Sequence, residues 1–126
     1  RRELTSLSLQ IMSFGFKNGI PNDADFVFDL RCLPNPYWEK ELREYSGKDQ
    51  PVMEFLSKQD SVSEMLEDLK SFLDRWIPHF ESDNRSYLSI AFGCTGGHHR
   101  SVYIAEQLTS YFKELGKPVI LRHRDI

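Results

Sequence analysis

The most concentrated chemistry lies in GCTGGHHRS, positions 93–101, where a thiol, three glycines, two imidazoles and a guanidinium fall within nine residues. A glycine-rich turn that enters a helix exposes backbone N–H groups at the positive end of the helix dipole, which favours a bound anion. Arg100 adds a fork of donors that suits two phosphate oxygens, and Thr95 and Ser101 offer hydroxyls. The stretch therefore predicts a phosphate-binding loop. The alternative is a tight glycine turn in which Arg100 pairs with a carboxylate.

A second interpretation concerns the thiol. Cys94 and Arg100 are separated by five residues, and this spacing resembles the phosphate loop of cysteine-dependent protein tyrosine phosphatases, whose thiolate attacks phosphorus. A cysteine at a helix N-terminus beside arginine and histidine ionises more readily than a free one. Gly93 stands where that family usually has a histidine. Asp29 is a candidate leaving-group acid, but it could equally hold a sugar hydroxyl or pair with Arg31.

Metal binding is a third possibility for side chains of this kind. The potential ligands have neither zinc-finger nor zinc-ribbon spacing, and adjacent histidines point in different directions. They are Cys32, Cys94, His98, His99 and His123. We expect no metal site and no cofactor in this chain.

The loop requires elements that hold it in place, and the C-terminal third of the sequence predicts them. An apolar run at 87–93 indicates a strand, 101–115 has helical periodicity that Gly116 ends, and 118–122 indicates a second strand. This order predicts a strand–loop–helix–strand unit with neighbouring parallel strands, whose ligands gather at the carboxyl ends of the strands. The loop lies at such an end.

The N-terminal half contains two further strands and two helices. Alternation over 7–14 predicts a half-buried strand, and the apolar run at 26–31 predicts an interior strand that ends in Asp29 and Arg31. These two side chains face the same crevice as the loop if the strands are parallel. A short helix is predicted at 51–58. A longer helix begins at Ser61, where Ser61 and Glu64 have capping-box spacing, and buries an apolar stripe through Phe80. The fold class is α/β: one domain, 1–126, with a mainly parallel sheet flanked by helices.

Composition limits the partners. The 126 residues carry a net charge of −3 and no apolar run long enough to span a bilayer. A polyanion must therefore meet a local basic patch, and we expect no membrane partner. The candidate patches are Arg1 and Arg2, the Arg100 loop, and Arg122-His123-Arg124. Two cysteines and no secretory signal favour a reducing, cytoplasmic setting.

Two long blocks carry a more specific resemblance. SFGFKNGIPNDADFVFDLRCLPNPYW (13–38) and NRSYLSIAFGCTGGHHRSVYIAEQL (84–108) resemble the C-terminal domain of the RapZ family of RNase adapter proteins, also known as YvcJ-type nucleotide-binding proteins. In that family a preceding domain carries a Walker A motif for ATP or GTP. No GxxxxGK[ST] occurs in this chain, so the resemblance implies the second domain alone.

The resemblance implies a sensor of glucosamine-6-phosphate that binds small regulatory RNA, presents it to an endoribonuclease and so controls aminosugar synthesis, as a homo-oligomer. It implies a sugar pocket lined by Asp29 and Arg31, and an RNA-binding tail that begins around Arg122, His123 and Arg124. Tyr37 stands where relatives can have histidine. The implied phosphate end comprises Cys94, Thr95, Gly96, Gly97, His99 and Arg100, and His98 stands where relatives often have lysine. The residues themselves leave three functions open: a sugar-phosphate receptor, a cysteine phosphatase, and an interaction module that contacts only the phosphates of RNA.

Overall fold

The structure, a computed structural model, describes residues 7–126 and forms a four-stranded sheet with three α-helices. Three short 3₁₀ helices lie at Phe16–Asn18, Pro36–Trp38 and Lys40–Leu42. The main elements are β1 (Ser8–Gly15), β2 (Phe26–Asp29), α1 (Gln50–Ser57), α2 (Asp60–Glu81), β3 (Tyr87–Cys94), α3 (Arg100–Glu114) and β4 (Val119–His123). The α/β class and the positions of the strands and main helices are as the sequence predicts.

The sheet is entirely parallel, with the order β2-β3-β1-β4. The predicted strand–loop–helix–strand unit is present as β3, α3 and β4, but the prediction that its two strands are neighbours is wrong. The N-terminal strand β1 lies between them and pairs with both. Leu9 and Ile11 of β1 are almost completely buried. Because β1 lies in the centre of the sheet, it has hydrogen-bonding partners along both of its edges, β3 on one side and β4 on the other.

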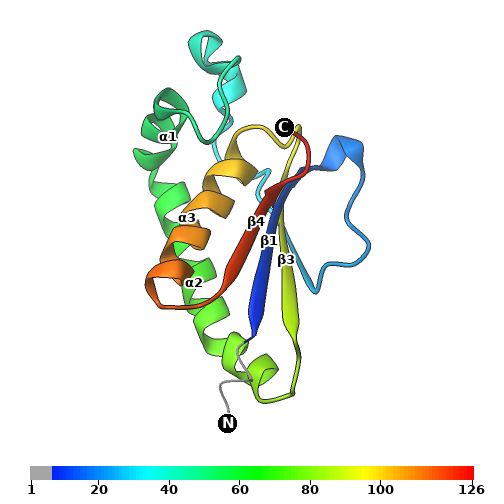
Figure 1. The fold of residues 1–126 in the computed structure, drawn as a ribbon. Coiled ribbons are helices and arrows are strands. Elements are labelled where there is room, and N and C mark those ends of the chain that lie inside the picture. Colours follow the sequence, from blue (N-terminus) through cyan, green and yellow to red (C-terminus); the bar gives the residue numbers. More distant parts are fainter. Residues whose placement is uncertain (1–6) are drawn as a thin grey trace.

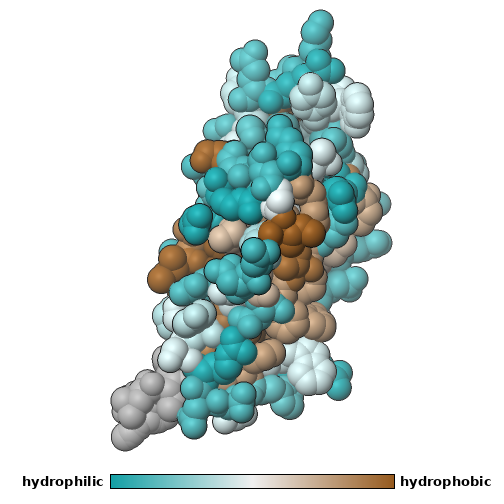
Figure 2. Space-filling model, turned by 90° about the vertical axis from the view of Figure 1, so that its right-hand side faces the viewer, coloured by the Kyte–Doolittle hydropathy of each residue, from teal (hydrophilic) through white to brown (hydrophobic). Residues whose placement is uncertain are grey.

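The helices lie on one side of the sheet, and the segment between β1 and β2 lies on the other (Figure 1). Alternate residues of the central strand show the two environments, because Ile11 is buried in the core whereas Gln10 is exposed. On the face turned away from the helices, hydrophobic atoms gather around a hollow of about 270 Å³ (Figure 2). Met12, Ile120 and Arg122 are among its lining residues.

The start of α2 differs from the prediction. The helix begins at Asp60, Gln59 occupies the N-cap position, and no side chain caps it, so Ser61 and Glu64 do not form a capping box. The turn from α1 decides this boundary, because the side chain of Gln59 donates to the carbonyl of Phe55 in α1 and its own carbonyl accepts from Val62 and Ser63.

The apolar stripe of α2 is only partly core. Leu69, Leu73 and Ile77 are buried, but Phe72 and Trp76 are more than a third exposed. Phe72 instead packs edge-on against Phe26 and Phe28 of β2. The helix therefore covers the sheet with one edge of its stripe and leaves the other edge at the surface.

Candidate functional site

The loop that joins β3 to α3 lies at the carboxyl end of the sheet, packed against the end of β1. Gly97 has φ +79°, and a Cβ built on it would lie 2.6 Å from the backbone nitrogen of Gly15. A Cβ on Gly15 would lie 2.4 Å from the carbonyl carbon of Gly96. The two backbones touch directly, which only glycine allows. The amide of Lys17 also donates to the carbonyl of Thr95 at 3.2 Å.

A pocket of about 600 Å³ opens beside this loop. Its cations come from three elements, namely Lys17 after β1, Arg43 in the segment that follows β2, and Arg100 at the start of α3. Among the described residues that line it there is no aspartate or glutamate. The full lining is Lys17, Asn35, Tyr37, Trp38, Arg43, Cys94, Thr95, Gly96, His98, His99 and Arg100. Such a wall stabilises an anion, because nothing acidic in it neutralises the three cations.

Arg100 is the buried cation of this pocket, with 4% of its surface exposed. Its Nη1 donates to the carbonyls of Arg31 (2.8 Å) and Leu33 (2.9 Å), and its Nη2 reaches the hydroxyl of Thr95 at 3.5 Å. Its Nε is buried and has no hydrogen-bond partner within residues 7–126. The guanidinium therefore pairs with no carboxylate of the described chain, unlike the alternative in which the glycine turn is merely structural.

Cys94 is buried, with 2% exposure, although it contributes to the pocket wall. Its thiol donates to the hydroxyl of Ser101 at 3.2 Å, and the Ser101 amide donates to the sulfur at 3.4 Å. The preceding position has no room for a side chain, because a Cβ on Gly93 would lie 2.4 Å from the ring of Phe14 and 2.7 Å from that of Phe16. The histidine that tyrosine phosphatases carry there does not fit this fold.

The two histidines have different environments, as their adjacency in the sequence predicts. His98 is exposed, whereas His99 is 7% exposed and its Nε2 finds no partner within the described chain. Burial lowers the pKa of His99, and backbone groups of Tyr45 and Arg43 oppose this shift only in part. His99 is therefore neutral at pH 7.

Asp29 and Arg31 lie at the same edge of the sheet as the loop, since Asp29 is in register with Gly93 of β3. They bind each other in two places, with Arg31 Nε 2.9 Å from one Asp29 oxygen and Nη2 2.7 Å from the other. Hydrogen bonds from Arg31 lower the pKa of Asp29. Asp29 is therefore ionised, which does not suit a leaving-group acid. Both side chains are half-exposed and lie outside the lining of the 600 Å³ pocket.

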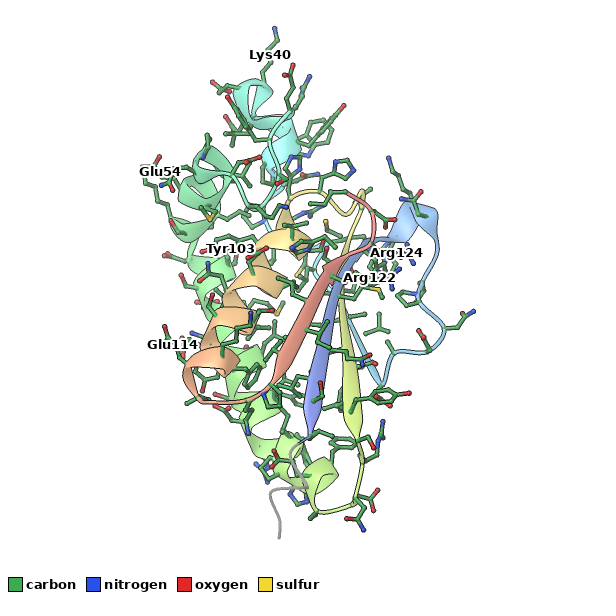
Figure 3. The ribbon with its side chains drawn as sticks, in the orientation of Figure 1. Lys40, Glu54, Tyr103, Glu114, Arg122 and Arg124 are labelled. Carbon is green, nitrogen blue, oxygen red and sulfur yellow. The ribbon has the colours of Figure 1, made fainter. Side chains whose placement is uncertain are left out.

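The segment 35–43 after β2, here called the arm, completes the pocket. Of its lining residues, only Tyr37 is among those named from the sequence. Arg43 donates from Nε to the carbonyl of Tyr37 at 2.7 Å, and its guanidinium lies 4.8 Å above the Tyr37 ring. Trp38 also lines the pocket and is 73% exposed. The tip of this arm, marked by Lys40, projects beyond the sheet (Figure 3). Lys17 could have been found from its place just after a strand, but Arg43 follows too many irregular residues to be placed from sequence.

The C-terminal basic motif lies at the same end of the sheet (Figure 3). His123 sits between Ser13 (Nδ1 to Oγ, 2.7 Å) and Glu106 (Nε2 to Oε2, 2.8 Å). Arg124 pairs with Asp125 at 3.0 Å. Arg122 is exposed. Of the three residues assigned to RNA binding, two are therefore engaged within the domain.

Among the described residues, no three histidine, cysteine or acidic side chains form a group that could hold a metal ion. Within 7–126, no helix has the length and apolar character needed to cross a bilayer.

Comparison with known proteins identifies relatives of this chain. The family model described as the RapZ C-terminal domain matches residues 7–126. A "Nucleotide-binding protein" of Stutzerimonas stutzeri is 58% identical over 116 residues, which are 92% of this chain and 41% of that protein. A protein of the same name from Methylobacillus flagellatus is 55% identical over 120 residues, 95% of this chain and 43% of that protein. The chain thus spans less than half the length of these relatives.

Proposed function

The chain belongs to the RapZ C-terminal domain family, and from that premise we propose that it is a regulatory receptor for an aminosugar phosphate, glucosamine-6-phosphate. The ligand binds in the pocket between the loop at 95–99 and the arm at 35–43. In the same proposal the domain binds small regulatory RNA and presents it to an endoribonuclease, as part of a homo-oligomer. We assign nucleotide binding, which the names of the relatives print, to the part of those proteins outside the match, because no GxxxxGK[ST] occurs in this chain.

The observation that carries this proposal is the buried guanidinium of Arg100, which faces a cationic pocket and has no carboxylate partner among the described residues. Burying a cation costs free energy unless an anion or a full set of acceptors compensates it. The carbonyls of Arg31 and Leu33 hold the guanidinium in place. A phosphate supplies the missing negative charge.

The remaining contacts of the proposed ligand follow from the pocket walls. Lys17 and Arg43 supply charge to the phosphate, and the Trp38 indole offers a flat apolar face to the sugar ring. Asp29 and Arg31 lie outside the pocket lining but are half-exposed at the same edge of the sheet, and we assign them to sugar hydroxyls that project out of the pocket. His98 also lines the pocket and is exposed.

Calorimetry of this chain with glucosamine-6-phosphate tests the proposal. Glucose-6-phosphate and inorganic phosphate report on the phosphate end, and glucosamine without phosphate reports on the sugar end. We expect binding to require the phosphate and the amino group to increase the affinity. The absence of heat with all four compounds would reject the receptor.

The phosphatase hypothesis remains a second candidate because Cys94 and Arg100 line the same pocket. We expect no catalysis for three reasons. The Cys94 thiol bonds to Ser101, the rings packed against Gly93 leave no space for a histidine side chain, and Asp29 is ionised. Incubation with a chromogenic phosphate ester decides this, with Cys94→Ser as control. Release above background by the unaltered chain that disappears in Cys94→Ser would establish the phosphatase instead.

RNA binding needs its own test, because the third candidate is a module that contacts only RNA phosphates. RNA affinity measured over a salt series should fall steeply as salt increases, since phosphate contacts release counterions. In our proposal glucosamine-6-phosphate changes that affinity. Two results together would establish the interaction module. Glucosamine-6-phosphate would leave the RNA affinity unchanged, and calorimetry would show no binding of the sugar phosphate.

A further inference from the structure

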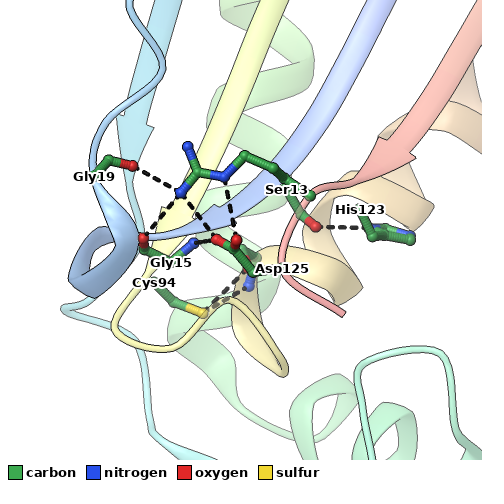
Figure 4. A network of polar contacts seen from close by, with 8 residues as sticks. Ser13, Gly15, Gly19, Cys94, His123 and Asp125 are labelled. Atoms are coloured by element: carbon green, nitrogen blue, oxygen red, sulfur yellow. Dashed lines mark hydrogen bonds and ion pairs between the residues drawn. The ribbon is translucent and has the colours of Figure 1, made fainter.

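Arg124 and Asp125 follow β4 and bond to the end of the neighbouring strand β1, where Asp125 lies beside Gly15 (Figure 4). A carboxylate oxygen of Asp125 accepts the amide of Gly15 at 2.6 Å. Arg124 Nη2 donates to the carbonyls of Gly19 at 2.8 Å and Gly15 at 3.4 Å, and pairs with Asp125 at 3.0 Å. Their side chains are 21% and 12% exposed, respectively. Arg124 and Asp125 are thus bonded to the segment 15–19.

That segment also supports the pocket. The backbone of Gly15 touches Gly96 and Gly97 of the loop so closely that neither Gly15 nor Gly97 has room for a side chain. Two residues later, the amide of Lys17 bonds to the carbonyl of Thr95, and Lys17 itself lines the pocket. A displacement of Gly15 must therefore move the loop, Lys17 or both.

We propose that Arg124 and Asp125 form a latch that positions the loop at 95–99 and Lys17 for the ligand without touching it. This inference rests on the proposed function for its consequence, because the pocket must bind a phosphate for the latch to affect affinity. Arg124 and Asp125 are positioning residues, and neither lines the pocket. Arg124, which the sequence assigns to RNA, thereby serves the sugar-phosphate site.

Electrostatics alone gives the opposite expectation for Asp125, which makes the latch testable. Burial acts to raise the pKa of Asp125, but hydrogen bonds from Arg124 and from the Gly15 amide outweigh it, and the pKa lies below its ordinary value. Asp125 is therefore a negative charge near a cationic pocket at neutral pH. Its removal should strengthen anion binding by charge alone, whereas loss of the latch should weaken it.

The first experiment compares Asp125→Ala with Asp125→Asn, because both remove the charge but only asparagine keeps an oxygen that accepts the Gly15 amide. Asp23→Ala removes an exposed carboxylate from the loop between β1 and β2 and serves as the matched control. For glucosamine-6-phosphate we expect a loss of about tenfold in Asp125→Ala, as for a hydrogen bond to a charged group. Asp125→Asn should recover most of this loss, and Asp23→Ala should leave the affinity unchanged. An affinity in Asp125→Ala equal to or tighter than that of the unaltered chain overturns the latch.

The second experiment needs no ligand and so separates a failure of the latch from a failure of the proposed function. Hydrogen exchange of the Lys17 amide reports the bond to Thr95. We expect exchange about tenfold faster in Asp125→Ala than in Asp125→Asn, with core amides such as Ile11 unaffected in both. Unchanged protection of Lys17 in Asp125→Ala rejects the latch even if the pocket binds no sugar phosphate. A change at Lys17 with no calorimetric signal in any variant rejects the proposed function and keeps the latch.

Discussion

Two basic motifs, His98-His99-Arg100 and Arg122-His123-Arg124, look alike in the sequence and differ in what their charges face. In the first, the buried Arg100 donates to two carbonyls and lines a pocket. No described residue in the lining of that pocket is acidic. In the second, His123 meets Glu106 and Arg124 meets Asp125. A count of positive side chains therefore does not identify an anion site. In our proposal, the site is marked by the guanidinium that has no carboxylate partner among the described residues after folding.

The backbone creates this contrast as much as the side chains do. The first motif follows a glycine turn pressed against β1, so its groups line a hollow. The second continues a strand, which directs successive side chains to opposite faces, and Arg122 alone is exposed. Binding at the first motif should accordingly depend on loop geometry, and binding at the second on exposed charge.

The largest effect should come from breaking the glycine turn. Gly97→Ala places a Cβ 2.6 Å from a backbone nitrogen at φ +79°, and backbone strain plus overpacking cost about 3 kcal/mol or more. Gly116→Ala is the matched control, because Gly116 also has positive φ (+82°) but open space around it. Its cost should stay near 1 kcal/mol. Denaturant unfolding measures both, and equal losses would show that the loop is not pressed against β1.

The second-largest effect should come from the removal of Arg100, which should weaken the binding of the sugar phosphate. Arg100→Ala takes away the charge that faces the pocket, and a charge-assisted hydrogen bond to phosphate is worth about 1.5–3 kcal/mol, or roughly 10- to 150-fold in affinity. Arg122→Ala removes the same charge from the other motif and should change sugar-phosphate affinity less than about twofold. Calorimetry with glucosamine-6-phosphate compares them. Similar losses in both variants would mean that general charge attracts the ligand.

A smaller effect on ligand affinity should distinguish Arg43, which lines the pocket, from Lys40 at the tip of the arm. Arg43→Ala removes a cation that lines the pocket and stacks on Tyr37, and we expect about a fivefold loss of affinity. Lys40→Ala removes an exposed cation three residues away, outside the lining. It should bind the ligand as the unaltered chain does. If Lys40→Ala weakens binding as much as Arg43→Ala, the arm attracts the ligand only through its overall charge.

The smallest effect should be the dependence of stability on pH that the buried His99 contributes. Burial lowers the pKa of His99 from the ordinary value of 6.5, so the unfolded chain takes up a proton first as the pH falls. Stability from this group is complete above pH 6.5 and declines below it, by at most about 1.4 kcal/mol per pH unit. Thermal unfolding between pH 7.5 and 5 should show a shallower slope in His99→Gln than in His98→Gln. Equal slopes would contradict the different environments.

Much of the fold was predictable because its signals are local. Apolar alternation located β1, and the glycine at the end of α3 located the boundary with β4, since period and turn chemistry involve only neighbouring residues. The prediction of a capping box at Ser61 was wrong because residues outside 61–64 determine where α2 begins. The turn from α1 sets that start. The adjacency of β3 and β4 failed likewise, since β1 comes from the other end of the chain.

The sequence by itself determined that a glycine loop follows a strand and that an arginine stands at the start of a helix, and this pattern is the basis of the proposed phosphate site. Only the tertiary structure decided which basic side chains are engaged, because Glu106 reaches His123 and the carbonyl of Gly19 reaches Arg124 through contacts between distant parts of the chain. It also brought Lys17 and Arg43 into the pocket from separate elements. Coulomb energy depends on distance and burial, and neither quantity is encoded in the spacing of residues along a motif.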